Sequence, residues 1–368
     1  MSDAYRSAGV DYRALDAGKR SALTEALATS ALLGAAGARA LDSSRGEPAF
    51  VFEAAGRLLA FVVEGLGTKS IIARQVEEQL GLSLFGNVAY DTVAAIVNDL
   101  CCVGALPMVV NAYFATGASD WYERRDRHQG LLAGWREGCV DAGATWGGGE
   151  SPSLPGLVEP SEIELAGSAV GMVPEGRRAI LGGDLAPGDE IVLVASSGLH
   201  ANGSSLARQV AERLERGYAT PLPSGRALGE VLLDRSVIYV GLVRSLLASR
   251  IDVRYLSHIT GHGLLKLMRP RRELTYRVRW LPEVPEVLEF LAGEAAIAPA
   301  GAYQTFNMGC GFAVYCAAGA GEEVVRLASE QGLSAGVAGF VEEGPRRVVL
   351  EPIDVVFESG NMDLAPRG

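Results

Sequence analysis

The sequence predicts a two-domain protein of mixed helix and sheet, of the α/β or α+β class. Its 368 residues exceed the roughly 150 residues of a typical domain. Segments with the alternation of strands follow segments with helical periodicity in both halves of the chain. Residues 173–189, the segment richest in the turn-forming residues glycine, proline and aspartate, separate these halves. We therefore expect domains over residues 1–172 and 173–350, followed by a tail over 351–368.

The first half is expected to begin with a loosely helical segment over residues 12–40. Residues 49–53 and 58–64 are apolar and alternating around Gly56, which predicts a hairpin. The same patterns predict helices at 70–80, 87–103 and 121–142, and strands at 107–116 and 163–172.

The second half repeats a strand, a glycine-rich loop and a helix. Strands are expected at 190–196, 253–259, 274–280, 311–317, 336–341 and 347–350. Helices are expected at 204–216, at 227–247 and directly after the loop that follows residue 259.

Composition excludes several classes of protein. The 33 basic and 44 acidic residues give a net charge of −11, which argues against binding to nucleic acid or to an anionic membrane. No apolar run reaches the ~18 residues of a membrane helix, and the N-terminus does not have the pattern of a signal peptide. The five cysteines show no C-x-x-C spacing, so we expect buried thiols in a reducing cytoplasm: Cys101, Cys102, Cys139, Cys310 and Cys316.

A first candidate site is the loop Glu64-Gly65-Leu66-Gly67-Thr68-Lys69, at a strand end that enters a helix. Its glycines would let the backbone approach an anion, and the start of the helix offers free N–H groups. Lys69 would add a positive charge and Thr68 a hydroxyl for phosphate or metal. The alternative is an ordinary strand–turn–helix corner.

Polar groups inside an apolar helix form the second candidate. Asp91 and Asn98 are seven residues apart and share a helical face, with Asp99 beside them and Gly104 after the helix. Such groups are unfavourable in an apolar run unless they are paired or bind metal, and Mg²⁺ prefers oxygen ligands. The alternative is a helix with a polar stripe.

Four further glycine-rich segments are spaced along the chain. One contains Gly148, Gly149 and Glu150 and is equally typical of a flexible surface loop. Two follow strands, residues 196–203 with His200, Asn202 and Gly203, and residues 258–263 with Thr260 and Gly261. The last contains Asn307. His200 would suit acid–base work or phosphate binding, although a single loop histidine is more often structural.

No nucleophile or zinc motif is present: G-x-S-x-G, H-E-x-x-H and spaced Cys/His sets are all missing. Loops suited to phosphate and scattered carboxylates suited to Mg²⁺ indicate phosphoryl transfer to a small substrate, where positioning and charge neutralisation do most of the catalysis.

Taken together and in order, these segments resemble the aminoimidazole ribonucleotide synthetase (phosphoribosylformylglycinamidine cyclo-ligase) family. Seven motifs carry the resemblance, from about Tyr5 to Leu350. They are Tyr5–Asp11 (family Y-x-x-A-G-V-D), Glu64–Lys69 (D-G-V-G-T-K), Asp99–Pro107 (D-x4-G-A-x-P), Ala115–Gly117 (A-T-G) with Gly148–Gly156 (G-G-E-T-A-E-M-P-G), Ser197–Gly203 (S-G-x-H-S-N-G), Ile259–Gly261 (L-T-G) and Thr305–Gly309 (T-F-N-x-G).

The chain departs from the family pattern in its loops. Glu64 replaces the family aspartate, and residues 151–153 lack the glutamate of the family loop. His262 stands where the family has glycine. The family lysine of the first helix has no counterpart at residues 23–26, although Lys19 is near. Ala201 replaces a serine.

The resemblance implies a fold and a reaction. It implies an N-terminal domain whose strands pair across a homodimer, and ATP held between the two domains. ATP would phosphorylate the amide oxygen of formylglycinamidine ribonucleotide, and a nitrogen would then close the imidazole ring of purine biosynthesis. The substrate would be a small amide or amidine ribonucleotide or an analogue.

The resemblance also implies roles for individual residues. Catalysis would involve His200, Lys69 and Asp99, while Mg²⁺ would be held by Glu64, Asp91, Asp99 and Glu150. ATP and phosphate would be bound by Gly65, Gly67, Thr68, Lys69, Asn98, Gly104, Gly148, Gly149, Asn202, Gly203, Thr260, Gly261 and Asn307.

Two alternatives remain open. The chain could be a superfamily member that activates a different amide or acid in a specialised pathway, which the loop departures favour. It could also be a catalytically silent ATP-binding subunit, against which the four retained acidic candidates argue. A histidine in place of a glycine beside phosphate would push the ligand away or contact it directly, and so retune the substrate.

Overall fold

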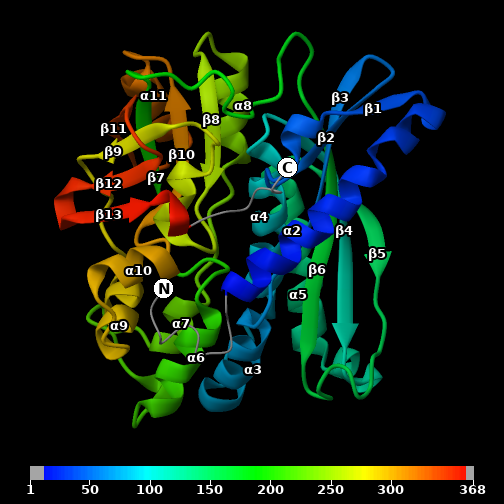
Figure 1. The fold of residues 1–368 in the computed structure, drawn as a ribbon. Helices are drawn as coiled ribbons and strands as arrows, with labels where there is room; N and C mark the ends of the chain where they lie inside the picture. Colours follow the sequence, from blue (N-terminus) through cyan, green and yellow to red (C-terminus); the bar gives the residue numbers. More distant parts are fainter. Residues whose placement is uncertain (1–11, 362–368) are drawn as a thin grey trace.

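Two sheets, one from each half of the chain, lie on either side of a central helix (Figure 1). The structure, a computed structural model, describes residues 12–361. The motif Tyr5–Asp11 and the last part of the expected tail therefore lie outside the described residues. Among the described residues no helix is long and apolar enough to cross a membrane.

The first sheet has the order β1-β2-β3-β6-β4-β5. Its strands are β1 (Ala38–Ala40), β2 (Phe50–Ala54), β3 (Arg57–Gly65), β4 (Leu106–Thr116), β5 (Thr145–Glu150) and β6 (Ile163–Met172). The expected hairpin is confirmed: β2 and β3 pair antiparallel, and Gly56 in the turn has a φ of 73°. All neighbours in this sheet are antiparallel except β4 and β5.

Helices cover one face of this sheet and leave the other open. The helices of this half are α2 (Tyr12–Ala28), α3 (Lys69–Leu80), α4 (Phe85–Cys101) and α5 (Arg125–Ala142). On the open face, Phe61 and Val63 alternate with the buried Ala60 and Val62. The inward side chains pack against α4, which contacts β3, β4 and β6.

The second sheet is larger, with the order β13-β12-β9-β11-β7-β10-β8. Its strands are β7 (Glu190–Ala195), β8 (Val253–His258), β9 (Leu274–Val278), β10 (Cys310–Cys316), β11 (Ala335–Glu343), β12 (Arg347–Leu350) and β13 (Val355–Glu358). The helices are α6 (Ser204–Arg213), α7 (Leu228–Leu232), α8 (Val240–Ala248), α9 (Glu286–Glu294), α10 (Pro299–Thr305) and α11 (Gly321–Glu330). In this sheet the described strands pair antiparallel except β9 and β12, and with one parallel pair in each sheet the fold is α+β.

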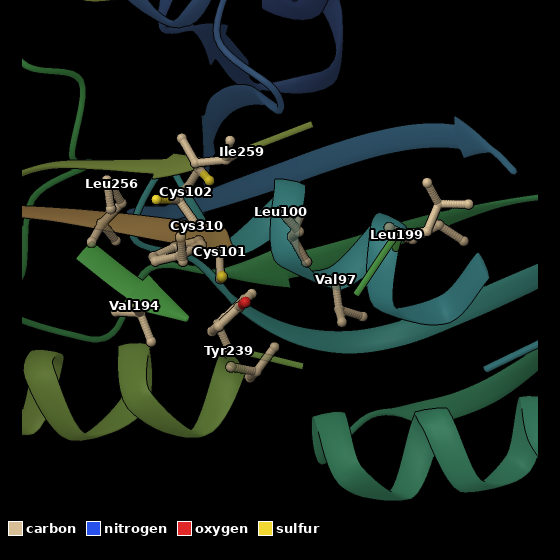
Figure 2. Packing of buried hydrophobic residues seen from close by; sticks show 14 of the residues in the cluster. Val97, Leu100, Cys101, Cys102, Val194, Leu199, Tyr239, Leu256, Ile259 and Cys310 are labelled. Carbon is tan, nitrogen blue, oxygen red and sulfur yellow. The ribbon is translucent and has the colours of Figure 1, made fainter. Parts of the chain in front are cut away.

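The core is continuous between the two halves, because α4 is buried on nearly all sides. Figure 2 shows Val97, Leu100 and Cys101 of α4 in one buried cluster with Val194 of β7 and Leu256 of β8. A helix that is apolar all round is stable only inside a protein. Three polar side chains of α4, those of Asp91, Asn98 and Asp99, bond to residues of the second half.

The helix expected over residues 227–247 is wrong in its middle. It is two helices, α7 and α8, separated by the non-helical residues 233–239. Side chains of α4 replace the missing helical hydrogen bonds: Asp91 Oδ1 accepts from the Ser236 amide at 2.6 Å and Asn98 Oδ1 from the Tyr239 amide at 2.8 Å. Local periodicity cannot reveal such distant partners.

Three smaller expectations are also corrected. The segment from Gly147 was expected as a loop, but residues 145–150 form the edge strand β5. The tail expected from residue 351 instead adds β13 to the second sheet, with Phe357 buried in the core and Val356 exposed. The segment after residue 262 is a 3-10 helix, Gly263–Met268, and not an α-helix.

Candidate active site

A cavity of about 330 Å³ lies between the two halves of the molecule. Its lining comes from the end of β3, the middle and end of α4, the loop after β7, the end of β8 and the 3-10 helix behind it, together with α2. The lining residues are Lys19, Glu47, Pro48, Glu64, Gly65, Leu66, Ala95, Asp99, Ala201, Asn202, His258, Thr260, Gly261, His262, Lys266 and Arg269. Six of the sequence-predicted residues are among them: Glu64, Gly65, Asp99, Asn202, Thr260 and Gly261.

Two carboxylates and a histidine form one cluster in this cavity. Asp99 Oδ1 lies 2.6 Å from His258 Nδ1, and the Asp99 carboxylate also hydrogen-bonds Glu64. Burial and the adjacent Asp99 raise the pKa of Glu64 to about 8. Burial would raise the pKa of Asp99 as well, but the hydrogen bond and charge of His258 outweigh it and the pKa is lowered. At neutral pH the pair therefore holds one proton on Glu64 and one negative charge on Asp99.

Two cations face this carboxylate pair. Lys266 is 7% exposed, and its ammonium donates a hydrogen bond to Thr260 Oγ1. Burial lowers the pKa of Lys266 to about 8, although the Asp99 charge opposes the shift. Arg269 donates two hydrogen bonds to the Gly46 carbonyl, the shorter at 2.7 Å. The cavity thus combines acids and bases in a small volume.

The helix α2 covers one side of the cavity. Lys19 of α2 lines it, and Asp16 Oδ2 lies 3.2 Å from His262 Nε2. His262 adopts a φ of 72°, a backbone conformation that favours glycine. Asp16 is the buried side chain of the described part of α2, while most of its other side chains are exposed. The Asp16–His262 contact is therefore a main attachment of this helix.

Lys69 and Asp91 lie behind the cavity and bond to each other. Both side chains are fully buried, and the Lys69 ammonium donates to Asp91 Oδ2 and, at 2.8 Å, to the His200 carbonyl. The second Asp91 oxygen accepts from the Ser236 amide. The structure does not bring Asp91 to Glu64 and Asp99, and it does not turn Lys69 into the cavity.

Asn98 also joins the two halves outside the cavity. Its Nδ2 donates to the Val237 carbonyl at 2.8 Å, while its Oδ1 accepts from Tyr239. All of its polar atoms are therefore engaged in holding the segment between α7 and α8. For Asp91 and Asn98 the structure matches the alternative of a polar stripe with structural partners.

His200 lies next to the cavity, in the loop after β7. Its Nε2 accepts a hydrogen bond from the Ser197 amide at 3.1 Å, which places the proton on Nδ1. Nδ1 is buried and has no hydrogen-bond partner among the described residues. Burial and the nearby His258 and Lys69 lower the pKa of His200 well below 6.5, so the ring is neutral. The backbone and the ring of His200 both support the loop.

The remaining glycine-loop residues lie around the cavity and outside its lining. Asn307 Oδ1 accepts from Ser196 Oγ at 2.8 Å, and its Nδ2 donates to the Gly198 carbonyl at 2.8 Å, so it ties the loop after β7 in place. A Cβ on Gly203 would lie 2.5 Å from the Phe306 ring. Thr68, after Gly67, lies close to this region, with its Oγ1 3.1 Å from Ser205 Oγ of α6, whereas a Cβ on Gly104 would contact Ile180.

The predicted residues Gly148, Gly149 and Glu150 stand apart. They lie on the exposed edge strand β5, where Glu150 pairs with Tyr113 of β4. β4 and β6 separate this strand from β3 and Glu64. The structure therefore does not bring Glu150 to the carboxylate pair. Among the described residues no three His, Cys, Asp or Glu side chains form a ready-made metal site.

Sequence reasoning missed five charged lining residues: Lys19, Glu47, His258, Lys266 and Arg269. For Lys19, His258 and Lys266 the sequence did hold a signal, the rarity of lysine and histidine in this chain. The chain has only three lysines and four histidines, and two of each line the cavity. Rarity alone does not give a partner, however, and the partners come from elements far apart in sequence.

Comparison with families and with known proteins supports one relationship. The model described as AIR synthase related protein, N-terminal domain, matches residues 46–173, and its C-terminal counterpart matches residues 186–351. A phosphoribosylformylglycinamidine cyclo-ligase from Carboxydothermus hydrogenoformans is 31% identical over 94% of this chain and 98% of its own length. The enzyme of that name from Sorangium cellulosum is 36% identical over 93% of this chain and 96% of its own length.

Solved structures with this fold are more distant in sequence. The thiamine-monophosphate kinase from Stenotrophomonas maltophilia has a TM-score of 0.58 at 18% identity, covering 82% of this chain and 88% of its own. The hydrogenase maturation protein HypE, solved in complex with ATP, has a TM-score of 0.55 at 16% identity, covering 81% and 83%. These likenesses show the fold.

Proposed function

The chain belongs to the AIR synthase related protein family, and we propose that it is an ATP-dependent cyclo-ligase of purine biosynthesis. Its substrate is formylglycinamidine ribonucleotide, and its products are aminoimidazole ribonucleotide, ADP and phosphate. The proposal is supported by the names of relatives that match almost the full chain. The main structural support is that four motif segments line one cavity. These segments contain Glu64, Asp99, Asn202 and Thr260.

The chemistry requires activation of a poor leaving group. Phosphorylation converts the amide oxygen of the substrate into a phosphate ester, and attack by the amidine-side nitrogen then closes the ring and expels phosphate. ATP binding is supported by the fold, which a protein solved in complex with ATP shares. Lys19, Lys266 and Arg269 supply positive charge for phosphate groups in the cavity.

The Glu64–Asp99 pair fits a magnesium ion that arrives with ATP. Mg²⁺ in nucleotide sites takes one or two carboxylates and completes its shell with phosphate oxygens and water. Glu64 and Asp99 form such a donor pair, in which burial and the neighbouring Asp99 charge raise the pKa of Glu64 and keep it protonated until the ion arrives. When bound, the ion would neutralise phosphate charge; Glu64 and Asp99 would hold it after the Glu64 proton leaves.

Three residues of the site expected from the sequence act indirectly in this proposal. Lys69 and Asp91 hold the His200 loop against α4, and His200 supports the backbone that presents Asn202 to the cavity. Glu150 belongs to the site only if β5 moves or a second subunit contributes it. Direct contact with the ion, the nucleotide or the substrate is proposed for five lining residues: Glu64, Asp99, Asn202, Thr260 and Gly261.

A homodimer is supported by the open face of the first sheet. Phe61, Val170 and Val109 form one row across β3, β6 and β4, and Val63 belongs to the next row. Phe61 is 43% and Val63 is 63% exposed. An apolar sheet face of this kind is typical of a protein–protein contact, and closed twofold symmetry would cover it with a second copy.

A cytoplasmic location is supported by the cysteines. All five are free thiols and buried in the structure, as is typical of proteins in a reducing compartment. Together with the acidic net charge this agrees with a metabolic enzyme that binds small molecules and neither nucleic acid nor membrane.

One observation favours a second candidate, a family member that activates a different amide. His262 replaces a family glycine and anchors α2 over the cavity through Asp16. Both candidates predict ADP release, and the substrate separates them. The experiment measures ADP release with formylglycinamidine ribonucleotide and with a panel of other amides, for the wild type and for His262→Gly.

The outcomes of this experiment differ clearly. A kcat/KM of ~10⁴ M⁻¹s⁻¹ or better on the purine intermediate, with no gain in His262→Gly, supports the cyclo-ligase. Poor turnover of that intermediate and good turnover of another amide support the second candidate. Absence of ADP release with every amide would favour a silent ATP-binding subunit.

A further inference from the structure

Three side chains in the cavity form a small, charge-balanced group: Glu64, Asp99 and Lys266. All three line the same 330 Å³ space, and they come from β3, α4 and the 3-10 helix behind β8. Both carboxyl groups interact electrostatically with the Lys266 ammonium. The two halves of the molecule therefore meet here through an acid pair and an internal cation.

The ammonium of Lys266 is fixed at this place. The side chain is 7% exposed, and its Nζ donates to Thr260 Oγ1 within its own loop. No carboxylate of the described residues lies within ion-pair distance of Nζ. The ammonium charge therefore acts on the cavity and on the Glu64–Asp99 pair, because Lys266 forms no salt bridge with another described residue.

An internal cation and a divalent cation compete for the same negative potential. Coulomb repulsion between the ammonium and a dication a few ångströms away, at the effective dielectric constant of a protein site, is worth far more than one factor of ten in affinity. Arg269 lies on the same wall, with its Nε 3.7 Å from the Glu47 carboxylate. Negative phosphate groups would remove the repulsion, because they attract the ammonium, the guanidinium and the dication together.

We propose that Lys266 is the internal counter-ion of the Glu64–Asp99 pair and makes divalent-cation binding at this pair conditional on nucleotide phosphate. This inference rests on the proposed ATP site, and it concerns a residue to which no motif assigns a role. In the empty enzyme the ammonium balances the acid pair and the cation is kept out. In the nucleotide complex the ammonium interacts with the phosphate groups, and Glu64 and Asp99 become available to bind the cation.

The first test measures Mn²⁺ binding alone, by electron paramagnetic resonance on the intact protein without nucleotide. Lys266→Met is expected to bind Mn²⁺ at least tenfold more tightly than the wild type, about 1.4 kcal/mol. Lys266→Arg keeps the charge and is expected to bind like the wild type. Arg326→Met, which removes the same charge from an exposed ion pair on α11, is the matched control and should change nothing.

A second measurement covers the case in which Lys266→Met does not fold. The chain contains three lysines, so their ¹³Cε signals can be resolved by NMR and that of Lys266 assigned with Lys266→Arg. Mg²⁺ alone is expected to leave the Lys266 signal in place, whereas Mg²⁺ with a non-hydrolysable ATP analogue is expected to shift it.

Two results would overturn the proposal. One is equal or weaker Mn²⁺ binding by folded Lys266→Met; the other is a Lys266 signal that shifts fully with Mg²⁺ alone. Neither readout involves turnover, so failure of the cyclo-ligase assay with intact nucleotide binding would leave this inference standing. If the ATP analogue does not bind at all, that result would instead contradict the proposed function, on which this inference rests.

Discussion

His258 and Asp99 are 159 residues apart in sequence and meet at 2.6 Å between the two halves of the protein. Asp99 lies in the last turn of the buried helix α4, and His258 ends β8. Their contact fixes the acid pair at the wall of the cavity. Because the second half of the chain supplies the histidine, the site exists only when both halves are folded together.

Asp99→Asn is expected to keep the fold and to weaken binding of Mg·ATP by at least tenfold. A neutral amide cannot balance the charges of the cation and the triphosphate together. Calorimetry with a non-hydrolysable analogue measures the affinity. Asp126→Asn, at the exposed start of α5, is the control for loss of one negative charge. Unchanged affinity in folded Asp99→Asn would contradict the assignment.

Lys69→Met is expected to lower the free energy of unfolding by about 3 kcal/mol, because it leaves the Asp91 carboxylate buried without its cation. Urea denaturation measures the change. The double variant Lys69→Met/Asp91→Leu should recover part of the loss, since it removes the unpaired charge. A loss below about 1 kcal/mol in the single variant would mean that this pair does not hold the two halves together.

Stability is expected to fall as the pH drops below about 6.5, the ordinary pKa of histidine. The pKa of His200 is lowered in the folded protein, so the unfolded chain binds a proton that the folded protein does not. The contribution of His200 is therefore complete above pH 6.5 and is lost on acidification. Thermal unfolding from pH 5 to 8 should show a smaller acid loss in His200→Gln than in the wild type or in His128→Gln. Equal pH profiles for all three would refute this.

Val63→Glu is expected to convert a dimer into a monomer with the chain mass of 38.6 kDa. A carboxylate on the open sheet face would be buried at the contact without a partner. Analytical ultracentrifugation at micromolar concentration measures the mass. Leu157→Glu, at a side chain that is 80% exposed in the loop between β5 and β6, should stay dimeric. A monomeric wild type would rule out the proposed dimer.

The strands and helices with strong periodicity were predictable from the sequence. β6 and β12 were expected at the residues where they occur, and the hairpin around Gly56 was confirmed. Alternation and helical spacing are local properties, so a single segment carries the signal. The glycine-rich motifs also indicated the family, which the family models and the relatives bear out.

Long-range partners were decided only by the tertiary structure. Asp91, Asn98 and Asp99 occupy neighbouring positions of one helix, yet Asp91 and Asn98 bind backbone and Lys69 while Asp99 faces the cavity. A helix turns about 100° per residue, so adjacent polar residues can reach different neighbours. The sequence determined that these groups must have partners, because polar groups in an apolar helix are unfavourable without them. Which partners they have, and that Lys266 and His258 join Asp99, depended on how the second sheet packs against α4, and that packing is set by contacts between residues more than a hundred positions apart.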